Sequence, residues 1–270
     1  MTEPTTEPRI RPAPAYVPGH QLLAGKSVLI TAAAGAGIGF AAARRCAEEG
    51  CRALFISDIH EKRLEQAVDT LRAETGLQQI HGRLCNVASE DDVQALVADA
   101  QARLDGVDVL INNAGLGGAR RIVEMDDAEW SRVIDISLTG TFRMTRAMLP
   151  HMQARGRGAI VNNASVLGWR AQAEQAHYAA AKAGVMALTR CAALEAAPYG
   201  VRINAVAPSI AMHDFLKKSA PADLLNQLAS REAFGRAAEV WEVANVMVFL
   251  ASDYASYMTG EVLSVSSQHA

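Results

Sequence analysis

The 270-residue chain lacks several features that would each indicate a particular class of protein. Basic residues do not outnumber acidic ones, with 26 Lys and Arg against 29 Asp and Glu and a net charge of −3, and they form no stripe that would bind nucleic acid. No apolar run reaches the roughly 18 residues that a membrane-spanning helix needs. The polar start of the chain has no apolar core of a secretory signal. We therefore expect no nucleic-acid partner, no membrane segment and a cytoplasmic location.

Cysteines are also few and scattered. The chain has four, Cys46, Cys51, Cys85 and Cys191, with no Cys-x-x-Cys pair and no cluster of histidines near them. This pattern argues against a disulfide framework and against a metal site. We expect reduced, buried thiols and no bound metal.

What the chain does contain is an alternation of short apolar runs and longer helical patterns. The runs that predict strands are 27–30, 53–57, the stretch IHGRLC, 107–111, 158–163, 201–206 and 261–265. Helical patterns lie near 38–49, 61–74, 90–104, from Asp127 onward, 176–197 and 239–252. Such alternation predicts an α/β fold, in which a parallel sheet has helices on both faces. Right-handed crossovers make it a single doubly wound, Rossmann-type domain over 21–270. The Pro-rich residues 1–20 are expected to form a flexible arm.

The stretch LITAAAGAGIG, residues 29–39, joins the first expected strand to the first helix. Gly35, Gly37 and Gly39 would let the backbone turn sharply and approach a pyrophosphate at the helix N-terminus. Asp58 ends the second strand, where a carboxylate binds the adenosine ribose hydroxyls in such folds. A plain tight turn and a helix N-cap are the alternatives for the glycines and for Asp58, respectively.

Asp58 also bears on the choice of cofactor. A carboxylate at this position would repel a 2′-phosphate, which favours NAD(H) over NADP(H). Lys62 and Arg63 lie one helical turn further on, so NADP(H) stays open.

The stretch SVLGWRAQAEQAHYAAAKAG contains a candidate catalytic group. Tyr178 and Lys182 are spaced i and i+4, so they share one face of a helix. Tyrosine has an unperturbed pKa of about 10, and a neighbouring ammonium would stabilise its phenolate for proton exchange with an alcohol or ketone. Ser165, at the end of a strand, could hold the same substrate oxygen. An ordinary amphipathic helix is the alternative.

Together these residues resemble the short-chain dehydrogenase/reductase family over about 21–268. The motifs are the glycine loop, NNAG at 112–115, Ser165, the Tyr178-xxx-Lys182 pair and NAVAPS at 204–209. The resemblance implies an NAD(P)-dependent oxidoreductase that interconverts a secondary alcohol and a ketone, with seven strands in the order 3-2-1-4-5-6-7 and a homotetrameric assembly. Tyr178 would be the acid and base, Lys182 would bind the nicotinamide ribose and tune Tyr178, and Ser165 would polarise the carbonyl.

The resemblance also implies which residues line the cofactor cleft. They are Thr31, Gly35, Gly37, Ile38, Gly39, Asp58, Asn86, Val87, Asn113, Gly115, Tyr178, Lys182 and Ala211. Within this set, Asn86 and Val87 would flank the adenine.

The chain departs from the family pattern at three places. Ala32 replaces the first loop glycine if Thr31 is aligned and one residue is inserted, whereas an ungapped alignment puts Ala33 there. Ser137 replaces an Asn of the proton relay to Lys182, and we include it among the catalytic residues. His213 stands where a Thr would meet the nicotinamide carboxamide, with a surface histidine as the alternative.

This combination of motifs is similar to a narrower group of bacterial reductases, which act on the hydroxylated C/D-ring remnant of steroids. The resemblance implies a small-molecule substrate, a bicyclic hydrindane propanoyl-CoA. A 3-oxoacyl-thioester reductase and a regulatory protein that binds a cofactor without turnover are the alternatives. Phe215 and Leu216 could cover the ring system, and Lys217 and Lys218 could meet the CoA phosphates, or the lysines are simply solvated.

Overall fold

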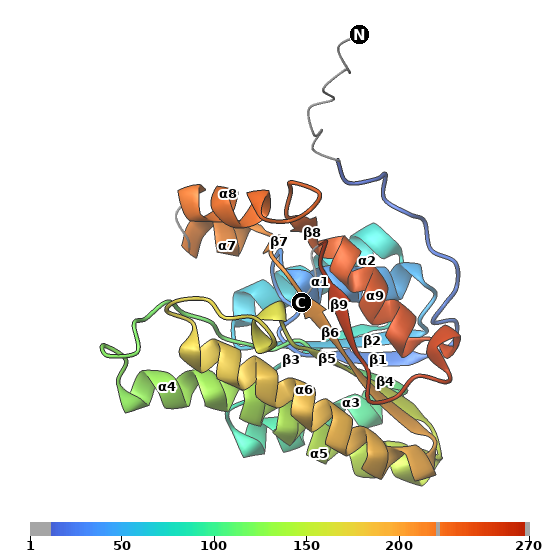
Figure 1. Cartoon of the computed structure of the whole chain (residues 1–270). Coiled ribbons are helices and arrows are strands. Elements are labelled where there is room, and N and C mark those ends of the chain that lie inside the picture. The colour runs from blue at the N-terminus through green and yellow to red at the C-terminus, as the bar shows by residue number, and fades with distance from the viewer. Residues whose placement is uncertain (1–11, 220–221, 268–270) are drawn as a thin grey trace.

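Seven parallel strands form the central sheet, and helices cover both of its faces (Figure 1). The computed structural model describes residues 12–219 and 222–267. The strand order is β3-β2-β1-β4-β5-β6-β9. The strands are β1 (Ser27–Ile30), β2 (Ala53–Asp58), β3 (Ile80–Leu84), β4 (Val109–Asn112), β5 (Gly158–Asn163), β6 (Val201–Pro208) and β9 (Val262–Val265). The predicted fold and strand order are confirmed. The seventh strand is the ninth in chain order because β7 (Ala211–Met212) and β8 (Ala238–Glu239) pair in a small sheet of their own.

The helices form two layers, each with its own apolar core against the sheet. One layer consists of α1 (Ile38–Glu48), α2 (Glu61–Thr75) and α9 (Val240–Ala251). The other consists of α3 (Glu90–Arg103), α5 (Gly140–Arg155) and α6 (Ala176–Ala196). Every residue of β1, β2 and β4 is buried, as expected for parallel strands between two helical layers.

Three shorter helices complete the fold. They are α4 (Asp127–Ile134), which precedes α5, and α7 (Asp214–Ser219) and α8 (Ala222–Ser230), which follow β6. In Figure 1, α7 and α8 lie together above the two loops that precede α4 and α6. The sequence predicts the start of α4, and the stretch ADLLNQLA that becomes α8 has a short helical pattern, whereas α7 is not predicted.

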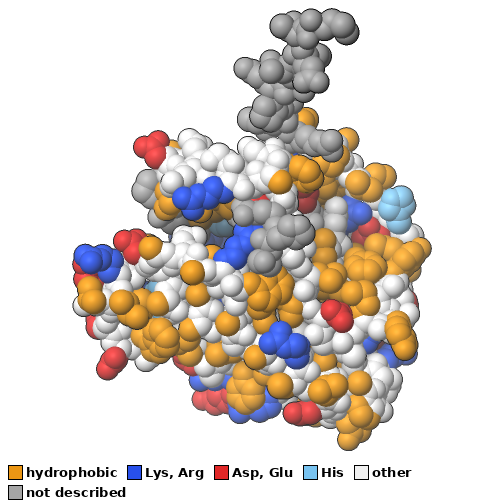
Figure 2. Space-filling view, viewed as in Figure 1, with side chains coloured by type: hydrophobic (Ala, Val, Ile, Leu, Met, Phe, Trp, Pro, Cys, Tyr) orange, Lys and Arg blue, Asp and Glu red, His pale blue; other side chains and the backbone are white. Residues whose placement is uncertain are grey.

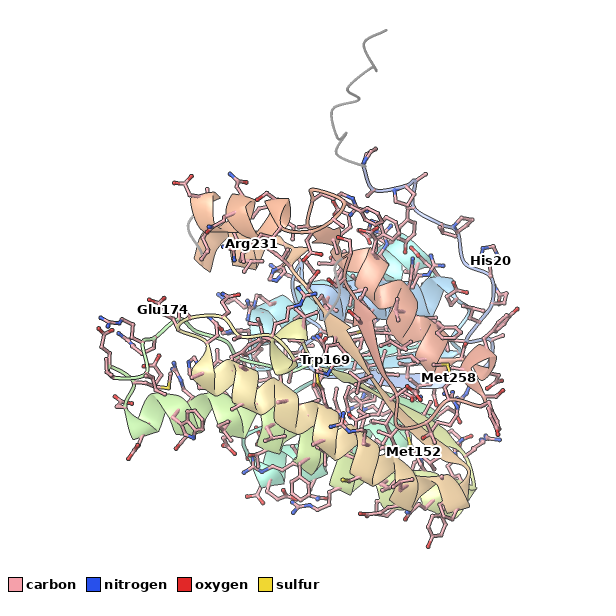
Figure 3. The ribbon with its side chains drawn as sticks, viewed as in Figure 1. His20, Met152, Trp169, Glu174, Arg231 and Met258 are labelled. Carbon is pink, nitrogen blue, oxygen red and sulfur yellow. The ribbon has the colours of Figure 1, made fainter. Side chains whose placement is uncertain are left out.

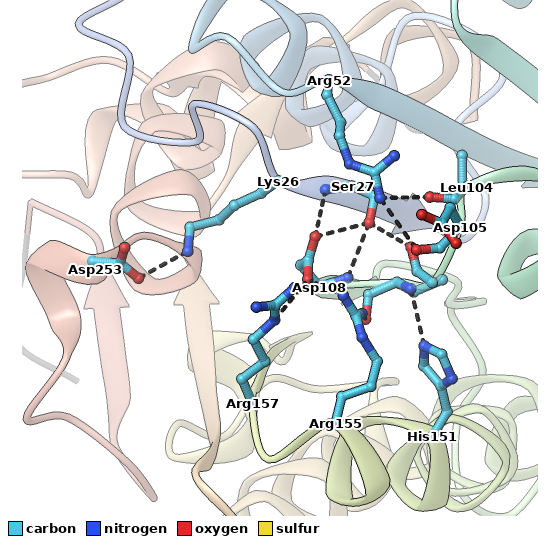
Figure 4. Close-up of polar contacts among 12 residues, drawn as sticks. Lys26, Ser27, Arg52, Leu104, Asp105, Asp108, His151, Arg155, Arg157 and Asp253 are labelled. Atoms are coloured by element: carbon cyan, nitrogen blue, oxygen red, sulfur yellow. Dashed lines mark hydrogen bonds and ion pairs between the residues drawn. The ribbon is translucent and has the colours of Figure 1, made fainter.

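The amino ends of β1 and β4 are joined through Asp108 (Figure 4). Its carboxylate accepts hydrogen bonds from the amide and hydroxyl of Ser27, both at 3.0 Å, and from Arg155 at 2.8 Å. Burial alone would raise the pKa of Asp108, but the Ser27 hydrogen bonds and the Arg155 charge outweigh it and hold this pKa below its usual value. The glycine loop leaves the other end of β1, so this network stabilises the fold at a distance from the loop.

Part of the N-terminal arm packs on α1. Glu49, which is fully buried, accepts hydrogen bonds from the amides of His20 at 2.7 Å and Leu22 at 3.0 Å, and it pairs with Arg45 at 2.5 Å. The Tyr16 ring stands edge-on to Trp241 of α9, with 5.4 Å between centroids. These contacts place 16–20 against α1 and α9, and the flexibility of the arm stays a prediction. Residues 1–11 of that arm lie outside the described residues.

The described residues also bear on the cysteines, on metal binding and on membrane-spanning helices. Cys46, Cys51 and Cys85 are buried free thiols as predicted, whereas Cys191 is exposed, so the prediction of a buried thiol is wrong there. The described ranges contain no group of acidic, histidine and cysteine side chains that could hold a metal ion. None of the helices in them is both long and apolar enough to cross a membrane.

Candidate active site

The loop between β1 and α1 has the backbone that an anion site requires. Gly35 has a φ of +115°, which side-chain-bearing residues rarely adopt, and a Cβ at Gly35 or Gly37 would meet nothing within 4 Å. The N-cap of α1, Gly37, makes no side-chain cap, and the first turn of the helix carries no acidic residue. The amide groups at the start of α1, including that of Ile38, are therefore left for a negative group such as a pyrophosphate.

Gly39 has a different role, because it is packed rather than open. A Cβ there would lie 2.4 Å from the carbonyl oxygen of Ala32 and 2.4 Å from Nδ2 of Asn113. Only glycine lets α1 approach the loop this closely. The predicted glycine loop thus combines two open positions with one tight contact to its own start.

Ala32 has left-handed backbone, with a φ of +51°, although it is not a glycine. Alignment through Thr31 places the missing family glycine at this residue, whereas Ala33 is fully buried and its amide donates to the Ser57 carbonyl at 2.9 Å. The conformation therefore favours the alignment with one inserted residue.

Thr31 and Asn113 hold the loops after β1 and β4 together. The Thr31 hydroxyl accepts hydrogen bonds from the amides of Asn113 and Ala114 at 3.0 and 3.1 Å. The Asn113 side chain donates to the Ala32 carbonyl at 2.9 Å and accepts from Asn163 Nδ2 at 2.9 Å. Both predicted cofactor residues thus use their polar atoms to shape the cleft.

Asp58 lies at the end of β2 and faces the glycine loop. It is buried, and its carboxylate accepts hydrogen bonds from the amides of Ala34 at 3.2 Å and His60 at 3.1 Å. Burial raises the pKa of Asp58, and the hydrogen bond from the Ala34 amide and the Arg63 guanidinium, 3.5 Å away, oppose the rise. The N-cap of α2 is His60, not Asp58. The capping alternative for Asp58 is therefore wrong, and its ribose-binding role stays a prediction.

The structure places the other predicted cleft residues at the same carboxyl edge of the sheet. Asn86 forms the turn after β3, where its side chain accepts from the Ala88 amide at 3.0 Å. Val87 is buried, and a Cβ at Gly140 would lie 2.7 Å from it. Ala211 is buried in β7.

Ser165, Tyr178 and Lys182 come together at the start of α6. The Ser165 hydroxyl accepts a hydrogen bond from the Leu167 amide at 3.2 Å and lies close enough to the Tyr178 phenol to lower the pKa of that phenol. Nζ of Lys182 lies 5.5 Å from the centroid of the Tyr178 ring. The i, i+4 spacing thus places Lys182 beside the Tyr178 ring, and the end of β5 brings Ser165 to the same tyrosine.

Burial governs the electrostatics of this group. It raises the pKa of the Tyr178 phenol, although the neighbouring Ser165 hydroxyl opposes this, and it lowers the pKa of Lys182 to about 8. Tyr178 is therefore protonated at neutral pH, and Lys182 holds a proton that it can release close to neutrality.

The described partner of Lys182 is a backbone carbonyl. Nζ donates to the Asn163 oxygen at 2.5 Å. A Cβ at Gly115 would lie 3.3 Å from the same Nζ, so this predicted residue leaves room for the ammonium. Asn163 was not among the predicted residues, although an asparagine pair that ends an apolar strand is a signal that could have indicated it.

Ser137 lies on a π-helical turn, Asp135–Thr139, between α4 and α5, which the sequence does not predict. Its fully buried hydroxyl donates to the carbonyl of Leu116 and accepts from the amide of the same residue, each at 2.9 Å. The structure therefore connects Ser137 to the loop after β4 and records no hydrogen bond from it to Lys182. A part in the proton relay stays a prediction.

The segment after β6 is only partly described. His213 accepts a hydrogen bond from the Leu216 amide at 3.3 Å, and burial lowers its pKa. Lys217 is exposed and lies 3.9 Å from Asp214. The side chains of Phe215 and Lys218 lie outside the described residues.

Figures 2 and 3 show the face of the molecule that carries α7, α8 and the loop before α6. In Figure 3, Arg231, directly after α8, lies above Trp169, and Glu174 stands on the loop before α6. Figure 2 shows hydrophobic side chains spread over the lower part of this face, below α7 and α8.

Comparison with known proteins places this geometry in a family. The profile described as Enoyl-(Acyl carrier protein) reductase matches residues 32–267. The chain is 60% identical, over 95% of its length and 98% of the relative, to the (5R,7aS)-5-hydroxy-7a-methyl-1-oxo-2,3,5,6,7,7a-hexahydro-1H-indene-carboxyl-CoA reductase of Mycobacterium tuberculosis. It is 43% identical, over 88% of its length and 94% of the relative, to the cis-4-hydroxycyclohexanecarboxylate dehydrogenase of Sinomonas cyclohexanicum.

A solved structure agrees with these relatives. A short chain dehydrogenase from Mycobacterium smegmatis matches with a TM-score of 0.85 and 53% identity, over 96% of this chain and 99% of that one. Together with the strand order and the Ser, Tyr and Lys arrangement, these matches show that the chain is an oxidoreductase of the short-chain dehydrogenase/reductase family, whose members bind nicotinamide cofactors.

Proposed function

We propose that the protein interconverts a secondary alcohol and a ketone on the ring of a bicyclic, steroid-derived CoA thioester. The observation that carries the proposal is the grouping of Ser165 and Lys182 around the Tyr178 side chain at the start of α6. The ring and the thioester are inferred from the relatives, since one is named for an indene-carboxyl-CoA and the other for a hydroxylated cyclohexane ring.

In ketone reduction, the Tyr178 hydroxyl donates a proton to the substrate oxygen while Ser165 holds that oxygen by a hydrogen bond. The raised pKa of Tyr178 keeps the phenol protonated at neutral pH, which is the state that this direction needs. The ammonium of Lys182 stabilises the phenolate that is left. Hydride transfer is the chemistry that a bound nicotinamide cofactor supplies. In alcohol oxidation the same proton moves the opposite way.

The start of α1 would hold the pyrophosphate of the cofactor, and Asp58 the adenosine ribose. We propose NAD(H) as the preferred cofactor, because a buried carboxylate repels a 2′-phosphate. Arg63 pairs with Asp58 at 3.5 Å and weakens this repulsion, so NADP(H) is the alternative.

We also propose a homotetramer in the cytoplasm, without a nucleic-acid partner. Support for the assembly comes from large apolar side chains on the surface, since Leu194, Tyr254 and Tyr257 are mostly or fully exposed. Exposed apolar groups of this kind are typical of surfaces between subunits. Sedimentation analysis of the purified protein tests the assembly.

The test of the proposed function is turnover, with both cofactors, on three substrates side by side: the bicyclic hydroxy acyl-CoA, cis-4-hydroxycyclohexanecarboxylate and a straight-chain 3-oxoacyl-CoA. We expect the highest kcat/KM for the bicyclic thioester. Faster reduction of the straight-chain thioester would favour the alternative of a 3-oxoacyl-thioester reductase. Cofactor binding without turnover of any ring or chain substrate would favour the regulatory alternative.

A further inference from the structure

His177 immediately precedes Tyr178 on α6, and its side chain is fully buried. Among the described residues, neither of its ring nitrogens has a hydrogen-bond partner, and no other described side chain has two such buried atoms. Buried polar atoms are nearly always paired, and a neutral imidazole carries both a donor and an acceptor. An apolar side chain would fill this position without leaving either atom unpaired, so the histidine calls for an explanation beyond packing.

The ring faces a glycine and a carboxylate. A Cβ at Gly118 would lie 3.5 Å from Nε2 of His177 and 3.9 Å from Oε1 of Glu129. Because Gly118 has no side chain, a space is left beside it. Nε2 of His177 on α6 and Oε1 of Glu129 on α4 both border this space. The other oxygen of Glu129, Oε2, accepts a hydrogen bond from Arg120 at 3.0 Å, while Oε1 has no recorded bond among the described residues.

The glycine belongs to residues 117–121, which we call the covering segment because it lies against the Tyr178 ring. A Cβ at Gly117 would be 3.6 Å from Cδ2 of Tyr178. Two hydrogen bonds fasten the covering segment to the loop before α6: Gln175 Nε2 donates to the Gly118 carbonyl at 2.7 Å, and the Arg120 amide donates to the Glu174 carbonyl at 2.9 Å. Any shift of Gly118 therefore changes how the covering segment meets Tyr178.

We infer that His177 is a positioning residue: its Nε2–H bonds Oε1 of Glu129 across Gly118 when substrate draws the covering segment onto Tyr178. This bond joins α6 to α4 and fixes the segment between them. The inference rests on the proposed function, because it concerns the fit of the ring substrate beside Tyr178. The ring, which has no hydrogen-bond partner among the described residues, would gain one in the complex with substrate, and this gain would strengthen substrate binding.

Four variants and a control test this role. His177→Leu removes both nitrogens at similar volume, His177→Gln keeps a donor, and Glu129→Met removes both carboxylate oxygens. The double variant of His177→Leu with Glu129→Met tests whether the two residues act together. Thr189→Val is the matched control: it is also a buried polar residue of α6, but its hydroxyl is paired, because it accepts from Asn162 at 2.9 Å. For each protein we would measure the melting temperature, the cofactor dissociation constant, and kcat and KM for the best substrate of the panel above.

His177→Leu should keep or raise the melting temperature and leave cofactor binding unchanged, while KM rises by about ten-fold. Glu129→Met should raise KM by a similar factor, and the double variant should be no worse than either single one. His177→Gln, which keeps a donor, should recover part of the loss. Thr189→Val should lower the melting temperature and leave KM unchanged.

An unchanged KM in His177→Leu overturns the inference, as does a fall in its melting temperature with no change in KM. If the increases in KM of the two single variants multiply in the double variant, the pairing of His177 with Glu129 is overturned. These outcomes are separate from the proposed function, since that fails only if the parent protein itself does not turn over the bicyclic thioester. The comparison of variants would then be made on whichever secondary alcohol the parent oxidises.

Discussion

The ammonium of Lys182 donates a 2.5 Å hydrogen bond to the backbone carbonyl of Asn163 and so ties α6 to the end of β5. A backbone acceptor cannot titrate, so it holds the amine in place in either charge state. Burial meanwhile lowers the pKa of Lys182 to about 8. The position of this amine and its charge are thus controlled by different features of the fold.

Removing the Lys182 amine should make the fold more stable at neutral pH and abolish most of the activity. The folded pKa of about 8 lies below the ordinary 10.5, so the unfolded chain binds more protons between these values, and the lysine destabilises the fold most below pH 8. Lys182→Met should therefore raise the free energy of unfolding at pH 7 by up to about 3 kcal/mol, and this gain should vanish above pH 10.5. Urea titrations at both pH values check this. A variant less stable than the parent at pH 7 would contradict it.

Replacing Tyr178 by Phe removes the proposed proton donor while keeping the ring in its place. Turnover should fall by about a thousand-fold or more, and the cofactor dissociation constant should hardly change. Tyr199→Phe is the matched control, because Tyr199 is an exposed tyrosine just beyond the same helix. Near-parental turnover in Tyr178→Phe would exclude the mechanism.

Asp58 and Arg63 should shift cofactor preference in opposite directions. Asp58→Ala removes the charge that repels a 2′-phosphate, so the ratio of kcat/KM for NAD(H) to that for NADP(H) should fall. Arg63→Ala removes the cation 3.5 Å from Asp58, so the ratio should rise. Steady-state kinetics with both cofactors measure the two ratios. If the parent protein strongly prefers NADP(H), our interpretation of Asp58 is wrong.

Ala32→Gly should stabilise the protein, because Ala32 holds a φ of +51° that glycine adopts without steric cost. The expected gain in unfolding free energy is up to about 1 kcal/mol. Ala33→Gly is the comparison: Ala33 is fully buried and has no positive φ, so its loss of packing should destabilise the protein. Thermal unfolding of both variants gives the answer, and stabilisation by Ala33→Gly instead would favour the ungapped alignment of the loop.

The sequence predicts the strands and the spacing of Tyr178 and Lys182 because these depend on local patterns. Apolar runs between turn residues mark β1, β2 and β5, and four residues bring two side chains to one face of α6. The contact of Lys182 with Asn163 is different, because it depends on how far α6 lies along β5. Nothing in the chain next to either residue encodes that distance.

The environments of Ser137 and Cys191 also depend on how helices are placed, and so they could not be predicted from the sequence. The π-helical turn at Ser137 arises from the packing of α4, α5 and the loop after β4, so a residue-by-residue comparison with the family could not reveal that its hydroxyl is occupied by Leu116. Cys191 lies on α6, whose composition is apolar along much of its length, and only the placement of the helix on the sheet determines which residues face outward.

The contacts of Glu49 with the start of the chain set a practical limit on shortening this protein. A version that begins at residue 21 would lose the His20 amide as a donor to Glu49 and the Val17 and Pro18 carbonyls as acceptors for Arg45. The buried ion pair of Arg45 and Glu49 would then have fewer hydrogen-bond partners, a change that destabilises buried ion pairs. Tags and fusion partners are therefore best attached before Tyr16, so that the contacts of Arg45 and Glu49 with the start of the chain are kept.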